Sequence, residues 1–187
     1  PAELKNSLRQ IATSVDRAAH LVNQLLTLAR AEASDQGQQA LEPLDLDGIL
    51  RGQVEEWVMR ALDKRIDLGY EAAPSSEILG NALLLRELIS NLIDNALRYT
   101  PEGGRVTCRV VVQGDFVTLE IEDNGIGLSE EQAALVFERF YRVDGTGVDG
   151  SGLGLAIVRE IAELHHADAS LRPNPVERGA VARVVFS

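Results

Sequence analysis

The sequence predicts a two-layer α/β sandwich, in which a mixed β-sheet packs on helices, preceded by one long amphipathic α-helix. Helical and strand patterns alternate along residues 44–187, which indicates an α/β domain. Consecutive strands are separated by short turns and can pair as hairpins, which favours a mixed sheet over a doubly wound parallel sheet. The first thirty residues instead show the repeat of a helix that packs against other helices.

Composition excludes several classes of protein. The chain has 187 residues, of which 45% are hydrophobic, and this suffices for a folded core. With 18 Lys and Arg residues against 29 Asp and Glu residues, the net charge is −11, which argues against a general nucleic-acid-binding protein. The single cysteine, Cys108, rules out an internal disulfide and a cysteine zinc cluster. No apolar run approaches the ~20 residues of a membrane-spanning helix. Because the sequence begins at Pro1 without a methionine, we expect it to be part of a longer chain.

An amphipathic helix is expected over residues 1–33. Its apolar side chains alternate between spacings of four and three residues, as in a coiled-coil seam, at Leu4, Leu8, Ile11, Val15, Ala18, Val22, Leu25 and Ala29. Nothing within this segment can cover the seam, so we expect a partner helix in a dimer or four-helix bundle; the alternative is that the helix covers the following domain. Residues 34–43 lose the repeat and are expected to form a linker, and residues 44–187 form the compact domain.

The domain is expected to begin with a short extended segment and then to alternate between helices and strands. In chain order we expect a helix to residue 62, strands at 66–71 and 77–79, a helix at 81–99, a hairpin of strands 105–112 and 116–122, helices at 129–140 and 152–166, and strands at 169–172 and 180–186. Asp47 is expected to cap the first of these helices, and Asn81 the second. Ser129 and Gln132 form the capping-box pattern of the third.

Four polar side chains of the helix at 81–99 share one face. At 100° per residue they lie within about 80° of one another; they are Glu87, Asn91, Asn95 and Arg98. Carboxylate and amide oxygens suit a hydrated Mg²⁺, and a guanidinium suits phosphate oxygens. The alternative is an ordinary solvated helix face.

Two glycine-containing motifs follow. Asp-Asn-Gly-Ile-Gly at residues 123–127 ends a strand, where a carboxylate can accept a hydrogen bond while bare backbone lies flat against a ligand; the alternative is a simple strand-ending turn. Gly-Ser-Gly-Leu-Gly at residues 150–154 opens a helix, whose first N–H groups and dipole attract an anion. It has neither the Gly-Lys-Ser/Thr of a Walker loop nor the preceding strand of a dinucleotide fingerprint. Between the two motifs, Arg139 and Arg142 lie in a segment suited to a mobile lid over phosphate.

Together these motifs resemble the catalytic and ATP-binding domain of bacterial sensor histidine kinases. That domain belongs to a wider ATPase superfamily (the GHKL-type ATPase fold) shared with gyrase, the heat-shock-90 chaperones and the MutL repair proteins. Residues 91–101 are similar to the N box, 123–127 to the G1 box, 137–140 to the F box and 150–154 to the G2 box. Arg98 and Tyr99, after the second asparagine, are typical of the kinase branch. The resemblance covers about residues 44–187.

The resemblance implies roles for individual residues. Asn91 and Asn95 would hold Mg²⁺ on the triphosphate of ATP, with Glu87 ordering the metal or its water, so Glu87 and Asn91 are the expected catalytic residues. Asp123 would accept a hydrogen bond from the exocyclic amine of adenine.

Further residues would contact the nucleotide. Tyr99 would lie against the base or ribose, and Arg98 would meet a phosphate. Gly125 and Gly127 would let the backbone close on the nucleotide. The remaining expected contacts come from the lid and from the start of the following helix: Arg139, Arg142, Gly150, Gly152, Leu153 and Gly154.

Residues 1–33 resemble the second helix of the dimerisation and histidine-phosphotransfer hairpin of these kinases. The phosphoacceptor motif, a histidine followed by an acidic residue and Leu-Arg-x-Pro, is absent and is expected upstream, and His20 lacks that context. His166 stands where the family usually has a helix-ending glycine, which leaves open how that helix terminates. Gly179 and Ala180 loosely match the Gly-Thr of the last family motif, near the final strand.

The resemblance implies the cytoplasmic kinase core of a two-component sensor histidine kinase. Such a core binds Mg-ATP and passes the γ-phosphoryl to a histidine on the missing hairpin helix, and then to an aspartate of a response-regulator receiver domain. It also implies a homodimer and a bacterial inner-membrane location for the whole protein; the absence of a nucleic-acid partner is expected from the net charge of −11. Two alternatives stay open: an ATPase that hydrolyses ATP with Glu87 as the general base, and a non-catalytic dimerisation module with a vestigial pocket.

Overall fold

The computed structural model describes residues 41–74, 76–143 and 151–187. The helix predicted over residues 1–33, and residues 34–40 of the predicted linker, lie outside the described residues. Within the described part of the chain, no helix combines the length and the apolar character needed to cross a bilayer.

Five strands form one mixed sheet, as the sequence predicts. Their order across the sheet is β2 (Asp67–Glu71), β4 (Arg105–Gln113), β5 (Phe116–Asp123), β7 (Ala180–Phe186) and β6 (Asp168–Pro173). β2 pairs with β4 in parallel, and every other neighbouring pair is antiparallel. β1 (Glu42–Asp45) and β3 (Glu77–Gly80) pair antiparallel in a separate two-stranded sheet.

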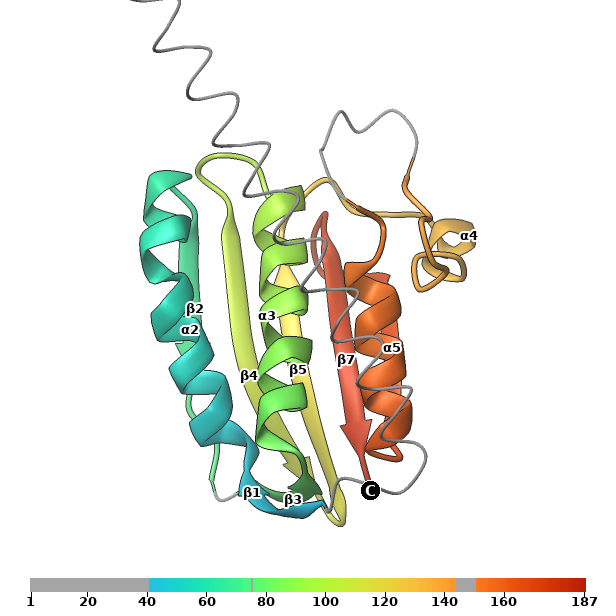
Figure 1. Ribbon diagram of the computed structural model, residues 1–187. Helices are drawn as coiled ribbons and strands as arrows, with labels where there is room; N and C mark the ends of the chain where they lie inside the picture. Colours follow the sequence, from blue (N-terminus) through green and yellow to red (C-terminus); the bar gives the residue numbers. More distant parts are fainter. Residues whose placement is uncertain (1–40, 75, 144–150) are drawn as a thin grey trace, which may run out of the picture.

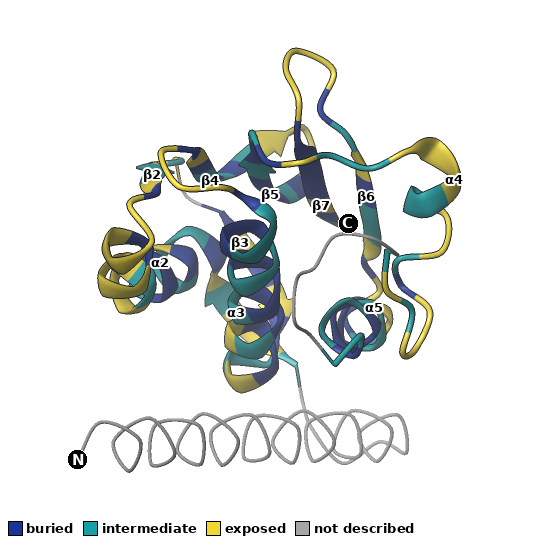
Figure 2. Ribbon diagram, turned by 90° about the horizontal axis from the view of Figure 1, so that it is seen from above, coloured by how far each residue is buried: buried dark blue, intermediate teal, exposed yellow. Residues whose placement is uncertain are grey.

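Three helices cover one face of the five-stranded sheet and form the second layer (Figure 1). They are α2 (Leu46–Asp63), α3 (Ala82–Tyr99) and α5 (Gly154–Leu164). Seen from above, α3 lies between α2 and α5 on the same side of the strands (Figure 2). Fully buried apolar side chains from both layers meet between them, including Leu88, Ile93, Leu119, Ile157 and Val184. The fold is therefore the predicted two-layer sandwich.

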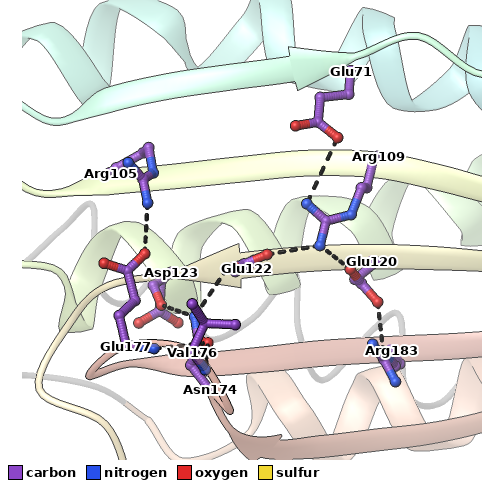
Figure 3. A network of polar contacts seen from close by, with 10 residues as sticks. All are labelled: Glu71, Arg105, Arg109, Glu120, Glu122, Asp123, Asn174, Val176, Glu177 and Arg183. Atoms are coloured by element: carbon purple, nitrogen blue, oxygen red, sulfur yellow. Dashed lines mark hydrogen bonds and ion pairs between the residues drawn. The ribbon is translucent and has the colours of Figure 1, made fainter.

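The opposite face of the sheet carries charged side chains in a row across four strands. The strand registers align Glu71, Arg109, Glu120 and Arg183. Ion pairs join each of these residues to the next (Figure 3). Opposite charges on directly opposed residues stabilise strand pairing. This face of the sheet is thus polar, as expected for the solvent side of a two-layer sandwich.

The helix predicted from Asn81 to Tyr99 is confirmed as α3. The Asn81 side chain accepts hydrogen bonds from Leu83 N at 3.0 Å and Leu84 N at 3.1 Å, which satisfies two of the amides that a helix N-terminus leaves unpaired. The predicted apolar positions are buried against the sheet and the neighbouring helices. Local sequence signals therefore suffice to place both ends of this helix.

The cap predicted for α2 is wrong. The helix begins at Leu46 with Asp45 as its N-cap residue, whose side chain makes no capping hydrogen bond. Ser76 supplies the acceptors: its hydroxyl accepts from Asp47 N at 2.9 Å and its carbonyl from Leu46 N at 3.1 Å. The Asp47 carboxylate instead accepts from the Tyr70 hydroxyl at 2.5 Å. Ser76 lies 29 residues beyond Asp47 in the chain, so local patterns could not identify it.

The helix predicted at residues 129–140 is much shorter. α4 spans only Glu130–Ala133. The predicted capping box is present, with Ser129 Oγ accepting from Gln132 N at 3.2 Å and Gln132 Oε1 accepting from Ser129 N at 2.8 Å. No residue of α4 is buried, so no apolar face stabilises further turns. The chain instead continues in turns to Phe140, which has a φ of 65°.

The helix predicted at residues 152–166 is α5, and its end resembles that of a helix closed by glycine. His166 has a φ of 53°. Ala167 N donates to Ala162 O at 2.9 Å, and His166 N donates to Glu163 O at 3.0 Å, which is the Schellman arrangement. Arg65, also with a φ of 53°, closes α2 in the same way. Two non-glycine residues therefore occupy positions that favour glycine.

Candidate functional site

The predicted motifs meet at one end of the domain. α3 ends there, β5 ends there and α5 begins there, next to α4 (Figure 1). Ile126 N donates to Tyr99 O at 3.2 Å, which joins the loop after β5 to the end of α3. Phe140 N donates to Gly152 O at 2.9 Å, which joins the lid segment to the start of α5. Motifs that are far apart in the sequence thus border one region.

Glu87 and Asn91 contact each other on α3. Asn91 is buried, and its Nδ2 donates to the Glu87 carbonyl at 2.9 Å and to Glu87 Oε1 at 3.2 Å. These contacts fix the orientation of the amide, with its nitrogen toward Glu87. Asn95 lies one turn further along and is half-buried. The predicted polar face therefore offers hard oxygen atoms at successive turns of one helix.

The donor set fits Mg²⁺ better than a transition metal. In the described residues, no group of three or more His, Cys, Asp or Glu side chains is arranged to hold a metal ion. A metal bound here would therefore depend on the Glu87 carboxylate, the amide oxygens of Asn91 and Asn95, and oxygens of a ligand. Oxygen ligands of this kind, completed by water and phosphate, are typical of Mg²⁺.

Arg98 is held by a residue that the sequence analysis did not include. Its guanidinium pairs with Asp94, four residues earlier on α3, and Asp94 Oδ1 also lies 3.4 Å from Arg60 of α2. On the same side of α3, Lys64 Nζ donates to Leu97 O at 2.7 Å, and burial lowers the pKa of Lys64. The i, i+4 spacing of Asp94 and Arg98 is a recognisable helix signal that could have predicted this pair.

Asp123 is a buried carboxylate at the end of β5. Its Oδ1 accepts hydrogen bonds from Gly125 N at 2.9 Å and Ala180 N at 3.3 Å. Burial raises the pKa of Asp123 to about 6, although these two hydrogen bonds oppose the shift. No group in the described part of the chain donates to Oδ2. The carboxylate is thus fixed through one oxygen and retains acceptor capacity at the other.

Close backbone contacts within the chain explain several of the glycines at the site. A Cβ on Gly125 would lie 2.4 Å from the Tyr99 carbonyl oxygen, and Gly127 has a φ of 72°. Gly152 has a φ of 71°, and a Cβ there would lie 2.7 Å from the carbonyl carbon of Phe140. These positions need glycine because backbone segments approach one another closely, independently of any ligand.

The residues just before α5 are held by burial and by one hydrogen bond. Leu153, the N-cap residue, is buried, and its amide donates to Ser151 Oγ at 3.2 Å. Gly154 is the first residue of the helix. Gly150 lies outside the described residues. The first turn of α5 lies at the end of the domain where α3 and β5 end (Figure 1), and the N-terminus of a helix favours anions.

The lid segment is attached to α5 by two ion pairs. Glu138 Oε1 lies 3.0 Å from Arg159, and Arg139 lies 3.6 Å from Glu160. Arg142, the other predicted lid cation, is exposed. The structure thus brings Arg139 to α5, whereas the sequence analysis expected it near phosphate.

The chain matches a known family over its second half. Residues 80–187 match the family model described as histidine kinase-, DNA gyrase B- and HSP90-like ATPase. The sensor protein kinase PmrB of Pseudomonas aeruginosa is 37% identical over 172 residues, which make up 91% of this chain and 36% of that protein. The sensor protein QseC of Escherichia coli K12 is 41% identical over 167 residues, which make up 88% of this chain and 36% of that protein. The chain spans little more than a third of the length of these relatives.

Solved structures show the same likeness. The mycobacterial sensor histidine kinase MprB superposes with a TM-score of 0.67 at 29% identity, covering 78% of this chain and 96% of that one. Full-length ShkA in complex with AMPPNP gives a TM-score of 0.77 at 28% identity, covering 100% of this chain and 39% of that one. These findings confirm the resemblance predicted from the four sequence boxes. The chain belongs to the histidine kinase-, DNA gyrase B- and HSP90-like ATPase family.

Proposed function

We propose that this chain binds Mg-ATP and is the kinase core of a sensor histidine kinase. In the complete protein, the γ-phosphoryl group passes to a histidine on a phosphotransfer hairpin and then to an aspartate of a response-regulator receiver domain. Support comes from the family match, from relatives named as sensor kinases, and from the ShkA structure, whose ligand AMPPNP is an ATP analogue.

The observation that carries the proposal is the arrangement of Asp123. Burying an ionised carboxylate costs free energy unless charged partners and hydrogen bonds compensate it, and the raised pKa of Asp123 reflects that cost. Its Oδ1 is fixed by Gly125 N and Ala180 N, while Oδ2 retains acceptor capacity. An ionised carboxylate with one oriented acceptor is suited to the exocyclic amine of adenine and would reject a base with a carbonyl at that position.

The polar face of α3 is suited to the triphosphate. In the proposed complex, Asn91 and Asn95 hold Mg²⁺, and Glu87 orders the metal or one of its waters. The bound metal supplies neutralisation of phosphate charge. The contact between Glu87 and Asn91 supports this assignment, because it fixes the carboxylate and the amide before any ligand binds.

The phosphate contacts come from the start of α5 and from arginines. Gly152, Leu153 and Gly154 present N–H groups to the phosphates, and Tyr99 lies against the base or ribose. Arg98 reaches a phosphate by exchanging its partner Asp94, as Arg139 does by exchanging Glu160. Arg142 and Gly150 complete the lid side of the site.

The remaining proposals concern the complete protein. The hairpin helices form a homodimer, and the chain lies in the cytoplasm as part of an inner-membrane sensor. The relatives named as sensor proteins support a place in a longer sensor protein, because this chain matches little more than a third of their length.

Calorimetric titration of ATP in the presence of Mg²⁺ tests nucleotide binding. We expect micromolar affinity for the wild-type chain and a loss of about tenfold or more for Asp123→Asn, because the amide presents a weaker acceptor. Asp115→Asn is the matched control, since Asp115 is an exposed carboxylate in the β4–β5 turn. Equal affinity of both variants would contradict the adenine role, and absence of binding to all three proteins would favour a vestigial pocket.

Phosphotransfer needs a second measurement. A hairpin that carries the phosphoacceptor helix is added as a separate protein together with γ-labelled ATP. We expect acid-labile label on the hairpin with the wild-type chain and little label with Asp123→Asn. Steady ATP hydrolysis that is equally fast without the hairpin would instead favour the ATPase alternative.

A further inference from the structure

The turn between β6 and β7 is folded around the side chain of Asn174. This residue is only 9% exposed. Its Oδ1 accepts hydrogen bonds from Val176 N at 2.9 Å and Glu177 N at 3.3 Å, and its backbone N donates to Gly179 O at 3.0 Å. An asparagine that binds amides two and three residues further along holds a turn in one conformation. The shape of this turn therefore depends on Asn174.

The same side chain ties the turn to the end of β5. Asn174 Nδ2 donates to Glu122 Oε1 at 3.0 Å and makes a longer contact of 3.4 Å with the Asp123 carbonyl (Figure 3). Glu122 is held in place from the other side by Arg109, at 2.7 Å. Burial alone would raise the pKa of Glu122, but the hydrogen bonds from Arg109 and Asn174 lower it overall, so the carboxylate stays ionised and accepts both. The acceptor of Asn174, the Glu122 carboxylate, is therefore itself held in place by Arg109.

The β6–β7 turn contacts both the backbone and the side chain of Asp123. Gly179 has a φ of 141°, and a Cβ there would lie 1.9 Å from the Asp123 carbonyl oxygen. The next residue, Ala180, donates its amide to Asp123 Oδ1 at 3.3 Å. On the far side of the turn, Glu177 pairs with Arg105 of β4 at 2.5 Å. The position of the Asp123 carboxylate is therefore coupled to the position of this turn.

We propose that Asn174 is a positioning residue for adenine recognition: by holding the β6–β7 turn against β5, it fixes the direction in which Asp123 Oδ2 accepts a hydrogen bond. This inference rests on the proposed function, in which Asp123 binds the exocyclic amine of ATP. Asn174 acts through Glu122, the Asp123 backbone and Ala180, and itself needs no contact with the nucleotide.

Two variants and two nucleotides test the role of Asn174 in the full chain. Asn174→Asp keeps an acceptor for Val176 N and Glu177 N but replaces the donor with a carboxylate beside Glu122. Asn174→Ala removes the side-chain contacts without adding charge. Each variant is titrated with ATP and with purine riboside triphosphate, in which a hydrogen replaces the exocyclic amine. We expect ATP to bind about tenfold more weakly to both variants, while affinity for the purine analogue changes by less than about twofold.

Arg183→Gln is the control for a general loss of stability. Arg183 pairs with Glu120 at 2.5 Å in the same sheet face but has no contact with Asn174 or Asp123. Urea unfolding establishes that each variant is folded at the titration temperature. Arg183→Gln should leave the ratio of ATP to purine-analogue affinity unchanged. A similar change of that ratio in Arg183→Gln would overturn a specific role for Asn174.

The outcomes separate the inference from the function on which it rests. In one outcome, the wild-type chain prefers ATP to the purine analogue, Asp123→Asn removes that preference, and both Asn174 variants retain it. This outcome leaves the proposed function standing but overturns the positioning role of Asn174. Equal weakening of both nucleotides in the Asn174 variants also overturns it, because a merely structural role would produce that result. If the wild-type chain shows no preference for ATP, the adenine role of Asp123 fails, and the inference fails with it.

Discussion

The imidazole of His165 joins the end of α5 to the beginning of α3. Its Nε2 accepts a hydrogen bond from Asn81 N at 3.0 Å, so Nδ1 carries the proton and donates to Ile161 O at 2.7 Å. The ring is buried and lies edge-on to Phe186 of β7, with the ring centroids 6.5 Å apart. Because α3 and α5 both border the candidate site, this neutral histidine helps to fix the distance between them.

This contact predicts a specific dependence of stability on pH. Burial lowers the pKa of His165 below its ordinary value of 6.5, although the bond to Ile161 opposes the shift. As the pH falls, His165 therefore becomes protonated in the unfolded chain before it does so in the folded one. The contribution of His165 to stability is complete above pH 6.5 and is lost as the pH falls toward the folded pKa. Relative to His165→Gln, we expect the wild-type free energy of unfolding to fall by up to about 1.4 kcal/mol per pH unit in that range. Urea unfolding between pH 5 and 8 measures this, and parallel curves for both proteins would contradict it.

For Asp123 we expect stability to depend on pH in the direction opposite to that of His165, and we expect ATP binding to weaken at low pH. Its folded pKa is about 6 against 3.8 for the ordinary carboxyl, so stability rises as the pH falls through 6. At pH 7, Asp123→Asn should be more stable than the wild type by about 2–3 kcal/mol, because the amide needs no buried charge and its oxygen can still accept from Gly125 N and Ala180 N. ATP affinity of the wild type should weaken below pH 6 as the carboxylate becomes protonated. Urea unfolding and calorimetry at pH 5 and 7 check both expectations, and a destabilised Asp123→Asn would refute the first.

Because His166 at the end of α5 has a left-handed backbone conformation, we expect glycine at this position to stabilise the chain. His166 is exposed and has a φ of 53°, a conformation that costs a residue with a Cβ about 1–2 kcal/mol. His166→Gly should raise the free energy of unfolding by roughly 0.5–1 kcal/mol, since the greater freedom of glycine in the unfolded chain offsets part of the gain. His166→Ala is the matched control, because alanine keeps the Cβ and should give no comparable gain. An equal gain from both variants would show that the imidazole itself is unfavourable.

Two glycine-to-alanine substitutions should have opposite effects. Gly125→Ala places a Cβ 2.4 Å from the Tyr99 carbonyl oxygen, so the loop after β5 must move away from α3; we expect a loss of about 2 kcal/mol or more and a large loss of ATP affinity. Gly52→Ala is the control, because nothing lies within 4 Å of a Cβ at that position of α2. It should stabilise the chain by about 0.5–1 kcal/mol through helix propensity. Thermal unfolding compares the two variants directly, and a fully stable Gly125→Ala would contradict the close approach.

Local patterns in the sequence determined most of the secondary structure. α3 could be predicted from its apolar repeat and from Asn81, because both signals act within a few residues. The hairpin of β4 and β5 and the capping box at Ser129 are local in the same way. The resemblance to sensor histidine kinases followed from four short motifs in a fixed order, which the family match confirms.

Contacts between distant segments were decided only by the tertiary structure. Ser76 in place of Asp47 at the start of α2, the pairing of Arg139 with Glu160, and the support of Asp123 by Asn174 each join residues that are far apart in the chain. The short extent of α4 has the same origin, since an apolar surface must be available before a helix continues. Hydrogen bonds and burial depend on which groups the fold brings together. The order of side chains along the sequence does not by itself say which distant residues lie close together in space.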